Sequence, residues 1–124
     1  KTLTRVCLAF FLMIFFTNLI FLLLPVQYPR ELYPLTEADG WLIDWIRNLD
    51  GSTNCFPSAH VSIVWLTWQA IRDEKPKLNL LFGVWCMLIV LSTLTTKQHY
   101  LVDIIGGAFL GHFCYKVASR IHTS

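Results

Sequence analysis

The stretch Cys55-Phe56-Pro57-Ser58-Ala59-His60 stands where a polar region gives way to an apolar segment. Proline followed by serine is typical of an entry turn and a helix N-cap, so a helix is expected to begin at Ser58. The backbone N–H groups of its first turn then point outward at the positive end of the helix dipole, where anions such as phosphate bind. His60, in that first turn, can donate a proton to an oxygen that leaves the phosphorus. A structural alternative stays open, in which Ser58 only caps the helix and His60 only tolerates the interface.

A second stretch, Thr95-Thr96-Lys97-Gln98-His99-Tyr100-Leu101-Val102-Asp103, also places a histidine at the mouth of an apolar segment. On a helix, His99 and Asp103 share one face, so the carboxylate can accept a hydrogen bond from one ring nitrogen. The other nitrogen is then unprotonated and aimed, as a histidine nucleophile or base requires. A lone aspartate beside Ile104 and Ile105 is costly within a membrane, which favours such pairing. A His–Asp pair that only joins helices is the structural alternative.

The composition predicts a membrane protein, because 55% of the residues are hydrophobic and 15% are charged. The run Val6 to Leu24 has only Thr17 and Asn18 as polar breaks, close to the roughly 20 apolar residues that cross a bilayer. It lacks the small-residue cleavage site of a secretory signal. The net charge of +2 and the lack of basic runs interleaved with aromatic residues make nucleic acid an unexpected partner. The four cysteines have no CxxC spacing, so neither a metal site nor a disulfide is expected.

The expected fold class is all-α, an integral-membrane helical bundle with about four transmembrane helices and a short interfacial helix. The four expected spans are Thr4 to Leu24, Ser58 to Ile71, Leu78 to Thr93 and His99 to Ala118. The second span is short, covering roughly 20 Å, so its Ser58 end should lie below the membrane surface. In the fourth, Gly107 and Gly111 form a GxxxG spacing that lets another helix approach closely. The interfacial helix is predicted from apolar residues at helical spacing, namely Trp41, Leu42, Trp45, Ile46 and Leu49.

Lysine and arginine residues beside the spans predict the orientation in the membrane. One face would hold Lys1, Arg5, Arg72, Lys75, Lys77, Lys116 and Arg120, and the other Arg30, Arg47 and Lys97. By the positive-inside rule the first face is cytoplasmic, so both histidine sites are expected to face periplasm, an organelle lumen or the exterior. Arg30 and Lys97 on that second face can neutralise phosphate oxygens. The alternative is that each anchors the interface.

With these motifs, the chain resembles the type 2 phosphatidic acid phosphatase superfamily, which includes lipid phosphate phosphatases, lipid phosphotransferases and the soluble vanadium haloperoxidases. The family's second motif, Pro-Ser-Gly-His, is similar to Pro57-Ser58-Ala59-His60. Its third motif is Ser-Arg, five residues, His, three residues, Asp. Ser92, His99 and Asp103 match this motif, and Thr93 stands in place of the arginine.

The first motif of that family, Lys, six residues, Arg-Pro, is matched at Arg30 alone, with Leu23 and Glu31 at the other two positions. Lys97 is expected to supply the charge that the third motif lacks. The sequence around both histidines is most similar to the branch that contains inositol phosphorylceramide synthases. Family members typically have six spans, so the resemblance implies that residues 1–124 form a single membrane domain, the last four helices of six. Two preceding helices of the same chain would then lie outside this sequence.

The resemblance also implies the chemistry of the site. His99 would attack phosphorus to form a phosphohistidine, Asp103 would orient it, and His60 would protonate the leaving alcohol. The phosphate oxygens would be held by Arg30, Ser58, the backbone of Ala59 and Lys97. No metal or other cofactor is implied.

The leading functional interpretation is therefore a membrane-bound lipid phosphate phosphatase, with a phospholipid or other lipid phosphate as substrate. A lipid phosphotransferase that passes a phospho-headgroup to a second lipid or alcohol is the alternative within this chemistry. A non-catalytic membrane scaffold or transporter fragment is the alternative of another class, with a His–Asp pair that is structural or relays protons. A serine hydrolase using Ser58 with His99 is disfavoured, because Ser58 lacks a nucleophile-elbow pattern.

Overall fold

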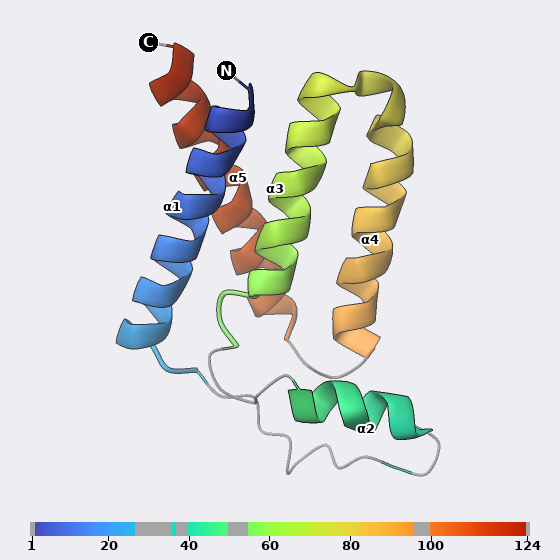
Figure 1. Cartoon of the computed structure of the whole chain (residues 1–124). Helices are drawn as coiled ribbons and strands as arrows, with labels where there is room; N and C mark the ends of the chain where they lie inside the picture. Colours follow the sequence, from blue (N-terminus) through green and yellow to red (C-terminus); the bar gives the residue numbers. More distant parts are fainter. Residues whose placement is uncertain (1, 27–35, 37–39, 50–54, 96–99, 124) are drawn as a thin grey trace.

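The structure is a computed structural model that describes residues 2–26, 36, 40–49, 55–95 and 100–123 (Figure 1). Its regular elements, all helical over these residues, are α1 (Thr2–Leu23), α2 (Gly40–Leu49), α3 (Ala59–Glu74), the 3-10 helix η3 (Pro76–Leu78), α4 (Asn79–Thr95) and α5 (Leu101–Thr123). The all-α prediction is confirmed. Each expected helix is present, with its ends shifted by a few residues.

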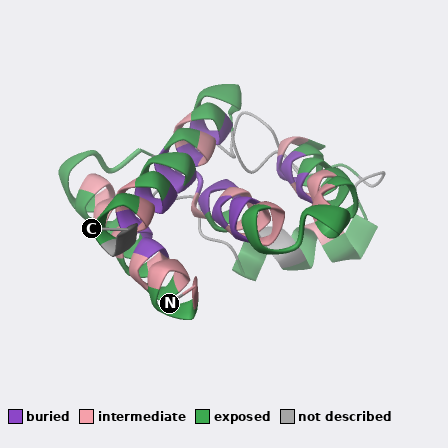
Figure 2. Ribbon diagram, turned by 90° about the horizontal axis from the view of Figure 1, so that it is seen from above, coloured by how far each residue is buried: buried purple, intermediate pink, exposed green. Residues whose placement is uncertain are grey.

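Helix α3 is the centre of the bundle. It packs against α1, α4 and α5, and α1 packs in turn against α5. Figure 1 shows the N-terminus, the C-terminus and the α3–α4 turn at one end of the bundle. The last turn of α1, the first turn of α3, the last turn of α4 and the first turn of α5 lie at the opposite end. Seen along the bundle, the buried residues of these helices face inward and the exposed ones outward (Figure 2).

Three stretches of the described chain are long and apolar enough to cross a membrane: Thr2–Leu23, Pro76–Thr95 and Leu101–Ile121. Helix α3, with 16 residues, has a length of about 24 Å and is shorter than these, as expected. Large apolar side chains cover the outer surfaces of α1 and α4, among them Phe11, Leu22, Leu80 and Leu88. A surface of this kind suits contact with lipid.

The main core lies where α1, α3 and α5 meet. It contains the buried residues Ala9, Met13, Leu66, Ala70, Leu110, Cys114, Tyr115 and Ala118. Small residues on α1 and α5 let these helices lie close to each other, and Ala9 and Ala118 are both fully buried. The core therefore fixes α5 against α1 at the end of the bundle where the two chain termini lie.

Glycines of α5 allow the start of α3 to pack directly on its backbone. A Cβ atom added at Gly107 would stand 2.5 Å from the carbonyl oxygen of Ser58, and one at Gly111 would stand 2.6 Å from that of Ser62. The hydroxyl of Ser62 lies 3.0 Å from the carbonyl oxygen of Ser58 and 2.9 Å from that of Gly107. The close approach predicted from the GxxxG spacing is confirmed, and its partner is α3.

A polar cluster joins α1, α3 and α5 at the end that holds the chain termini. The Arg5 guanidinium lies 2.9 Å from the Glu74 carboxylate, which also accepts a hydrogen bond from the Thr2 hydroxyl. Tyr115 donates a hydrogen bond of 2.8 Å to Asp73, and Arg5 stacks 5.3 Å from the centre of the Tyr115 ring. The helix ends expected to share one basic face therefore do share one end of the bundle. Which side of the membrane this end faces stays a prediction.

Helix α2 is the expected short amphipathic helix. It begins at Gly40, whose φ of 72° is readily adopted by glycine. Trp41, Leu42, Trp45 and Leu49 are all exposed. Figure 1 shows α2 lying crosswise beyond the ends of α3 and α4 at the end opposite the chain termini. Its position in the membrane interface stays a prediction.

Candidate active site at the start of helix α3

Ser58 caps α3 as the sequence predicts. It has an extended backbone, with φ −65° and ψ 111°, and its hydroxyl accepts a long hydrogen bond of 3.4 Å from the N–H of Val61. Its side chain is completely buried, whereas Ala59 is half-buried and His60 is exposed. The first turn of α3 therefore presents His60 outward from a fixed, buried cap. The N–H groups of such a first turn have no partner within their own helix.

The start of α3 is joined to the start of α5. The Ser58 N–H donates a hydrogen bond of 3.0 Å to the carbonyl oxygen of Asp103. Gly107, one turn further along α5, leaves room for this approach because a side chain there would collide with Ser58. Ser58, Ala59, His60 and Asp103, which are far apart in the sequence, thus come together at one end of the bundle.

The carboxylate of Asp103 is buried, with 1% of the residue exposed. It accepts a hydrogen bond of 2.8 Å from the Tyr100 N–H, and the Tyr100 carbonyl accepts from the N–H groups of Asp103 and Ile104. The carboxylate at N3 thus caps the N–H of Tyr100 at the N-cap, which is one of the two hydrogen bonds of a capping box. The sequence prediction treats Asp103 only as a partner of His99.

The fourth span was predicted to begin at about His99, and α5 begins two residues later, at Leu101. A pairing of His99 with Asp103 therefore does not follow from a shared helix face. His99 itself, with Lys97 and Arg30, lies outside the described residues, so the roles expected for these three stay predictions.

The described chain on either side of these three residues lies at the site end of the bundle. The Cys55 N–H donates a hydrogen bond of 3.0 Å to the carbonyl oxygen of Val26, which ties the chain after α1 to the residues before Ser58. Thr95 ends α4 and Tyr100 precedes α5 at the same end (Figure 1). In the sequence, Arg30 follows Val26 by four residues. Lys97 and His99 lie between Thr95 and Tyr100.

An apolar cluster supports the site from within the bundle. Val61, Val90 and Ile104, from α3, α4 and α5, are buried together, and Leu94 and Ala108 pack against them. These residues hold the ends of the three helices in a fixed arrangement. Among the residues that the structure describes, no three His, Cys, Asp or Glu side chains gather as metal ligands would.

The sequence matches the PAP2 superfamily over residues 1–117. The chain belongs to this superfamily. It is also similar to an uncharacterized protein of Methanocaldococcus jannaschii, with 31% identity over 107 residues that cover 86% of this chain and 44% of that protein. The chain thus spans less than half the length of this relative. No solved structure matches.

Membership of the PAP2 superfamily confirms the predicted family. Together with the three helices that are long and apolar enough to cross a membrane, it supports an integral membrane protein. The likeness to the branch with inositol phosphorylceramide synthases stays a prediction.

Thr93 departs from the PAP2 motif, and the structure gives its surroundings. It is buried in α4, with 5% exposed, and its hydroxyl donates a hydrogen bond of 2.7 Å to the carbonyl oxygen of Val90. The position where the family has an arginine thus holds a neutral side chain bonded to its own helix. Position 93 therefore contributes no positive charge at this end of α4.

A polar pair between α5 and α3, His112 and Gln69, lies deeper in the bundle and was not predicted from the sequence. His112 Nδ1 is 2.8 Å from Gln69 Oε1, which links α5 to α3. Gln69 is almost completely buried, with 1% exposed. A single glutamine in an apolar segment carries no periodic signal, so sequence patterns did not reveal this contact.

Proposed function

We propose that this chain carries the catalytic site of a membrane-bound phosphatase that removes phosphate from lipid phosphates through a phosphohistidine intermediate. The observation that supports it best is the junction of the two PAP2 motifs, where the Ser58 N–H is hydrogen-bonded to the carbonyl oxygen of Asp103. This bond brings the second motif, with its exposed histidine, to the aspartate that ends the third motif. Membership of the PAP2 superfamily supports the reaction class.

In this proposal, His99 attacks phosphorus with an unprotonated ring nitrogen, and the bond from phosphorus to the lipid oxygen breaks. His60 gives its proton to that leaving oxygen, which departs as an alcohol. Water then attacks the phosphohistidine, inorganic phosphate leaves, and His99 is regenerated. His60 takes a proton from the attacking water, which restores the acid for the next turnover.

Charge on the phosphoryl oxygens is met by fixed dipoles and by two cations. The first-turn N–H groups of α3, at Ala59 and His60, form the positive end of the helix dipole. Ser58 holds this turn in place through its buried cap. Arg30 and Lys97 supply the positive charges that stabilise the phosphoryl group in the transition state.

The proposed site faces away from the cytoplasm. Arg5, Arg72, Lys75 and Lys77 lie on the helices and the turn at the opposite end of the bundle (Figure 1). Basic residues that flank membrane spans are retained on the cytoplasmic side. The site is therefore assigned to the periplasm, an organelle lumen or the exterior.

The test is activity of the full-length protein in detergent or vesicles, measured with phosphatidic acid in the presence and absence of ceramide as an acceptor. Release of inorganic phosphate that is lost in His99→Ala is the expected result. Transfer of the phospho-headgroup to the added acceptor, without free phosphate, would show a phosphotransferase instead. A purified, folded protein with neither reaction on a panel of lipid phosphates would support the non-catalytic alternative.

A further inference from the structure

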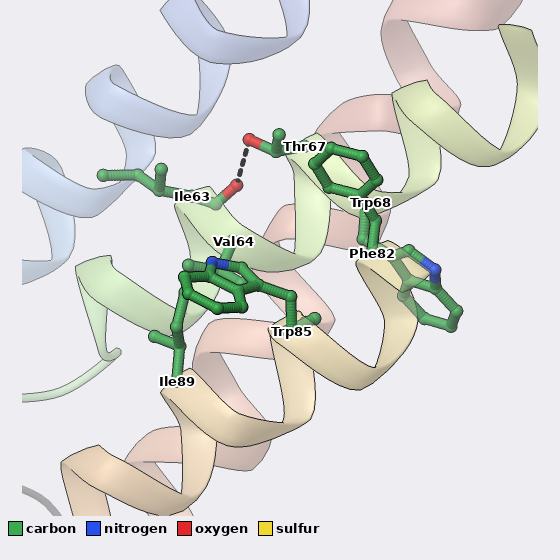
Figure 3. Close-up of a pocket in the computed structure, with 8 residues that line it drawn as sticks. Ile63, Val64, Thr67, Trp68, Phe82, Trp85 and Ile89 are labelled. Atoms are coloured by element: carbon green, nitrogen blue, oxygen red, sulfur yellow. Dashed lines mark hydrogen bonds between the residues drawn. The ribbon is translucent and has the colours of Figure 1, made fainter. Parts of the chain in front are cut away.

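A pocket of about 200 Å³ lies between α3 and α4 (Figure 3). Its α3 wall consists of Ile63, Val64, Thr67 and Trp68. The α4 wall includes Trp85 and Ile89. Figure 3 shows Val64 of α3 and Trp85 and Ile89 of α4 close together between the two helices. The volume is below the ~300–1,000 Å³ of pockets that enclose a whole small ligand, so it suits part of an extended molecule.

The lining of this pocket is mainly carbon. The Thr67 hydroxyl donates a hydrogen bond of 2.8 Å to the carbonyl oxygen of Ile63 in its own helix. The Trp68 indole N–H lies 3.0 Å from Asn79 Oδ1, so it too is already bonded. The α4 wall belongs to the stretch Pro76–Thr95, which is apolar enough to cross a membrane. A hydrocarbon chain therefore fits these walls better than a polar headgroup.

The α3 wall of the pocket lies on the same side of the helix as His60 of the proposed site. Ile63, Val64 and Thr67 follow His60 at intervals of three, four and seven residues, which places them on the same side of α3. The first of them lies about 5 Å further along the helix axis than His60. His60 and Ile63 are both exposed. The surface of α3 between the proposed site and the pocket, from His60 to Ile63, is therefore accessible.

We propose that this pocket binds a hydrocarbon chain of the lipid whose phosphate is held at His60. The inference rests on the proposed function and extends it, because it makes the apolar chain part of what the enzyme recognises. The lipid would be bound at two points, its phosphate at the first turn of α3 and its chain between α3 and α4. Binding at both points would position the phosphate ester bond between them. Selectivity for longer chains then arises in this pocket, with a gain of up to about fourfold for each methylene that a substrate taken up from water buries there.

The experiment compares kcat/KM for phosphatidic acid with two octanoyl chains and with two butanoyl chains, in the full-length protein. Val64→Trp fills the pocket and is expected to lower the octanoyl-to-butanoyl ratio at least about tenfold, with butanoyl activity retained. Val84→Trp is the matched control, because Val84 is an exposed residue of α4 that does not line the pocket. This control is expected to keep the wild-type ratio.

Trp85→Ala provides a second test that does not depend on fitting a larger side chain. Trp85 is 62% exposed, so its removal leaves the bundle core intact while it takes away one wall of the pocket. The ratio is expected to fall again. Unchanged ratios in both pocket variants, or an equal fall in Val84→Trp, would overturn the inference while the phosphatase activity stands. Failure of the wild type on both lipids would instead overturn the proposed function.

Discussion

His60 is exposed at the first turn of α3, whereas Ser58 and Asp103 beside it are buried. This difference agrees with a division of roles among the three residues. A group that exchanges protons with substrate and water has to reach them, while the groups that shape the site are better held by packing. Ser58 and Asp103 already serve as caps of α3 and α5, so a change at either would disturb structure as well as chemistry.

The effect of removing the proposed acid, His60, on the rate should depend on the leaving group of the substrate. In His60→Ala we expect kcat/KM, which reports formation of the phosphohistidine, to fall by about 10²–10⁴ with a lipid phosphate, because an alkoxide leaves poorly without a proton. The fall with p-nitrophenyl phosphate should be much smaller, since that leaving group needs little protonation. Parallel steady-state assays of both substrates measure this difference. Equal losses on the two substrates would contradict the role of His60 as the acid.

Lys97 is predicted to replace the arginine that the PAP2 pattern has at position 93. Thr93 is neutral and bonded within α4, so it contributes no charge. We expect Lys97→Gln to raise KM and lower kcat together, because the lysine acts in both the ground and transition states. Adding Thr93→Arg should recover part of the loss, since the long arginine side chain can extend from a buried position to the site. Wild-type kinetics in folded Lys97→Gln would show that Lys97 only anchors the interface.

Several features of the site were predictable residue by residue from local chemistry. The cap at Ser58 follows from Pro57 and the apolar run that begins after it. Helix α5 begins two residues after the start predicted near His99, because Asp103 at N3 caps the N–H of Tyr100, whereas the sequence pattern pairs Asp103 with His99. One carboxylate can satisfy both patterns, and spacing alone does not choose between them.

At the scale of helices, the contact between α3 and α5 determines where the two motifs meet. It depends on Gly107, because the carbonyl of Ser58 occupies the place of a side chain there. We expect Gly107→Ala to destabilise the protein by about 1–3 kcal/mol, as overpacking does when backbone has to move. It should also lower kcat by separating Ser58 from Asp103. Thermal unfolding in detergent and steady-state assays provide the two measurements.

Gly83→Ala is the matched control for that substitution. A Cβ atom at Gly83 would lie 3.2 Å from the Trp68 indole nitrogen, and a side chain can shift more easily than a backbone carbonyl. Its effect on stability should therefore be smaller than that of Gly107→Ala. Wild-type stability of Gly107→Ala would contradict the close packing of α3 on α5.

Helices were the most predictable part of the fold, because long apolar runs and their breaks fix them locally. The GxxxG spacing on α5 also predicted close packing, although the sequence did not name α3 as the partner. The bond between Ser58 and Asp103, the Gln69–His112 pair and the pocket beside Trp85 were not predictable. They depend on which helices become neighbours, and hydrophobic periodicity carries no information on that choice.

For the molecule as a whole, the two ends of the bundle differ in chemistry. One end carries the Arg5–Glu74 pair and the basic turn between α3 and α4, while the other carries Ser58, His60 and Asp103. The sequence predicted this separation from charge counts, and the arrangement of the helices agrees with it. Long basic side chains at one end also favour retention on the cytoplasmic side.

The orientation can be tested by cysteine labelling in intact cells, in a background that lacks the exposed Cys7. A membrane-impermeant thiol reagent is expected to label Glu37→Cys from outside and to label Lys75→Cys only after the cells are opened. Charge asymmetry beside the spans is the physical reason. Labelling of Lys75→Cys but not of Glu37→Cys in intact cells would place the site on the cytoplasmic side.

The central claim is that His99 carries the phosphoryl group during turnover. Its most direct test is rapid quenching of the full-length protein with lipid phosphate labelled on phosphorus, followed by identification of the labelled residue by mass spectrometry. We expect an acid-labile phosphate on His99 in the wild type and none in His99→Ala. An acid-stable phosphate on Ser58, or labelling of the protein that persists in His99→Ala, would contradict it.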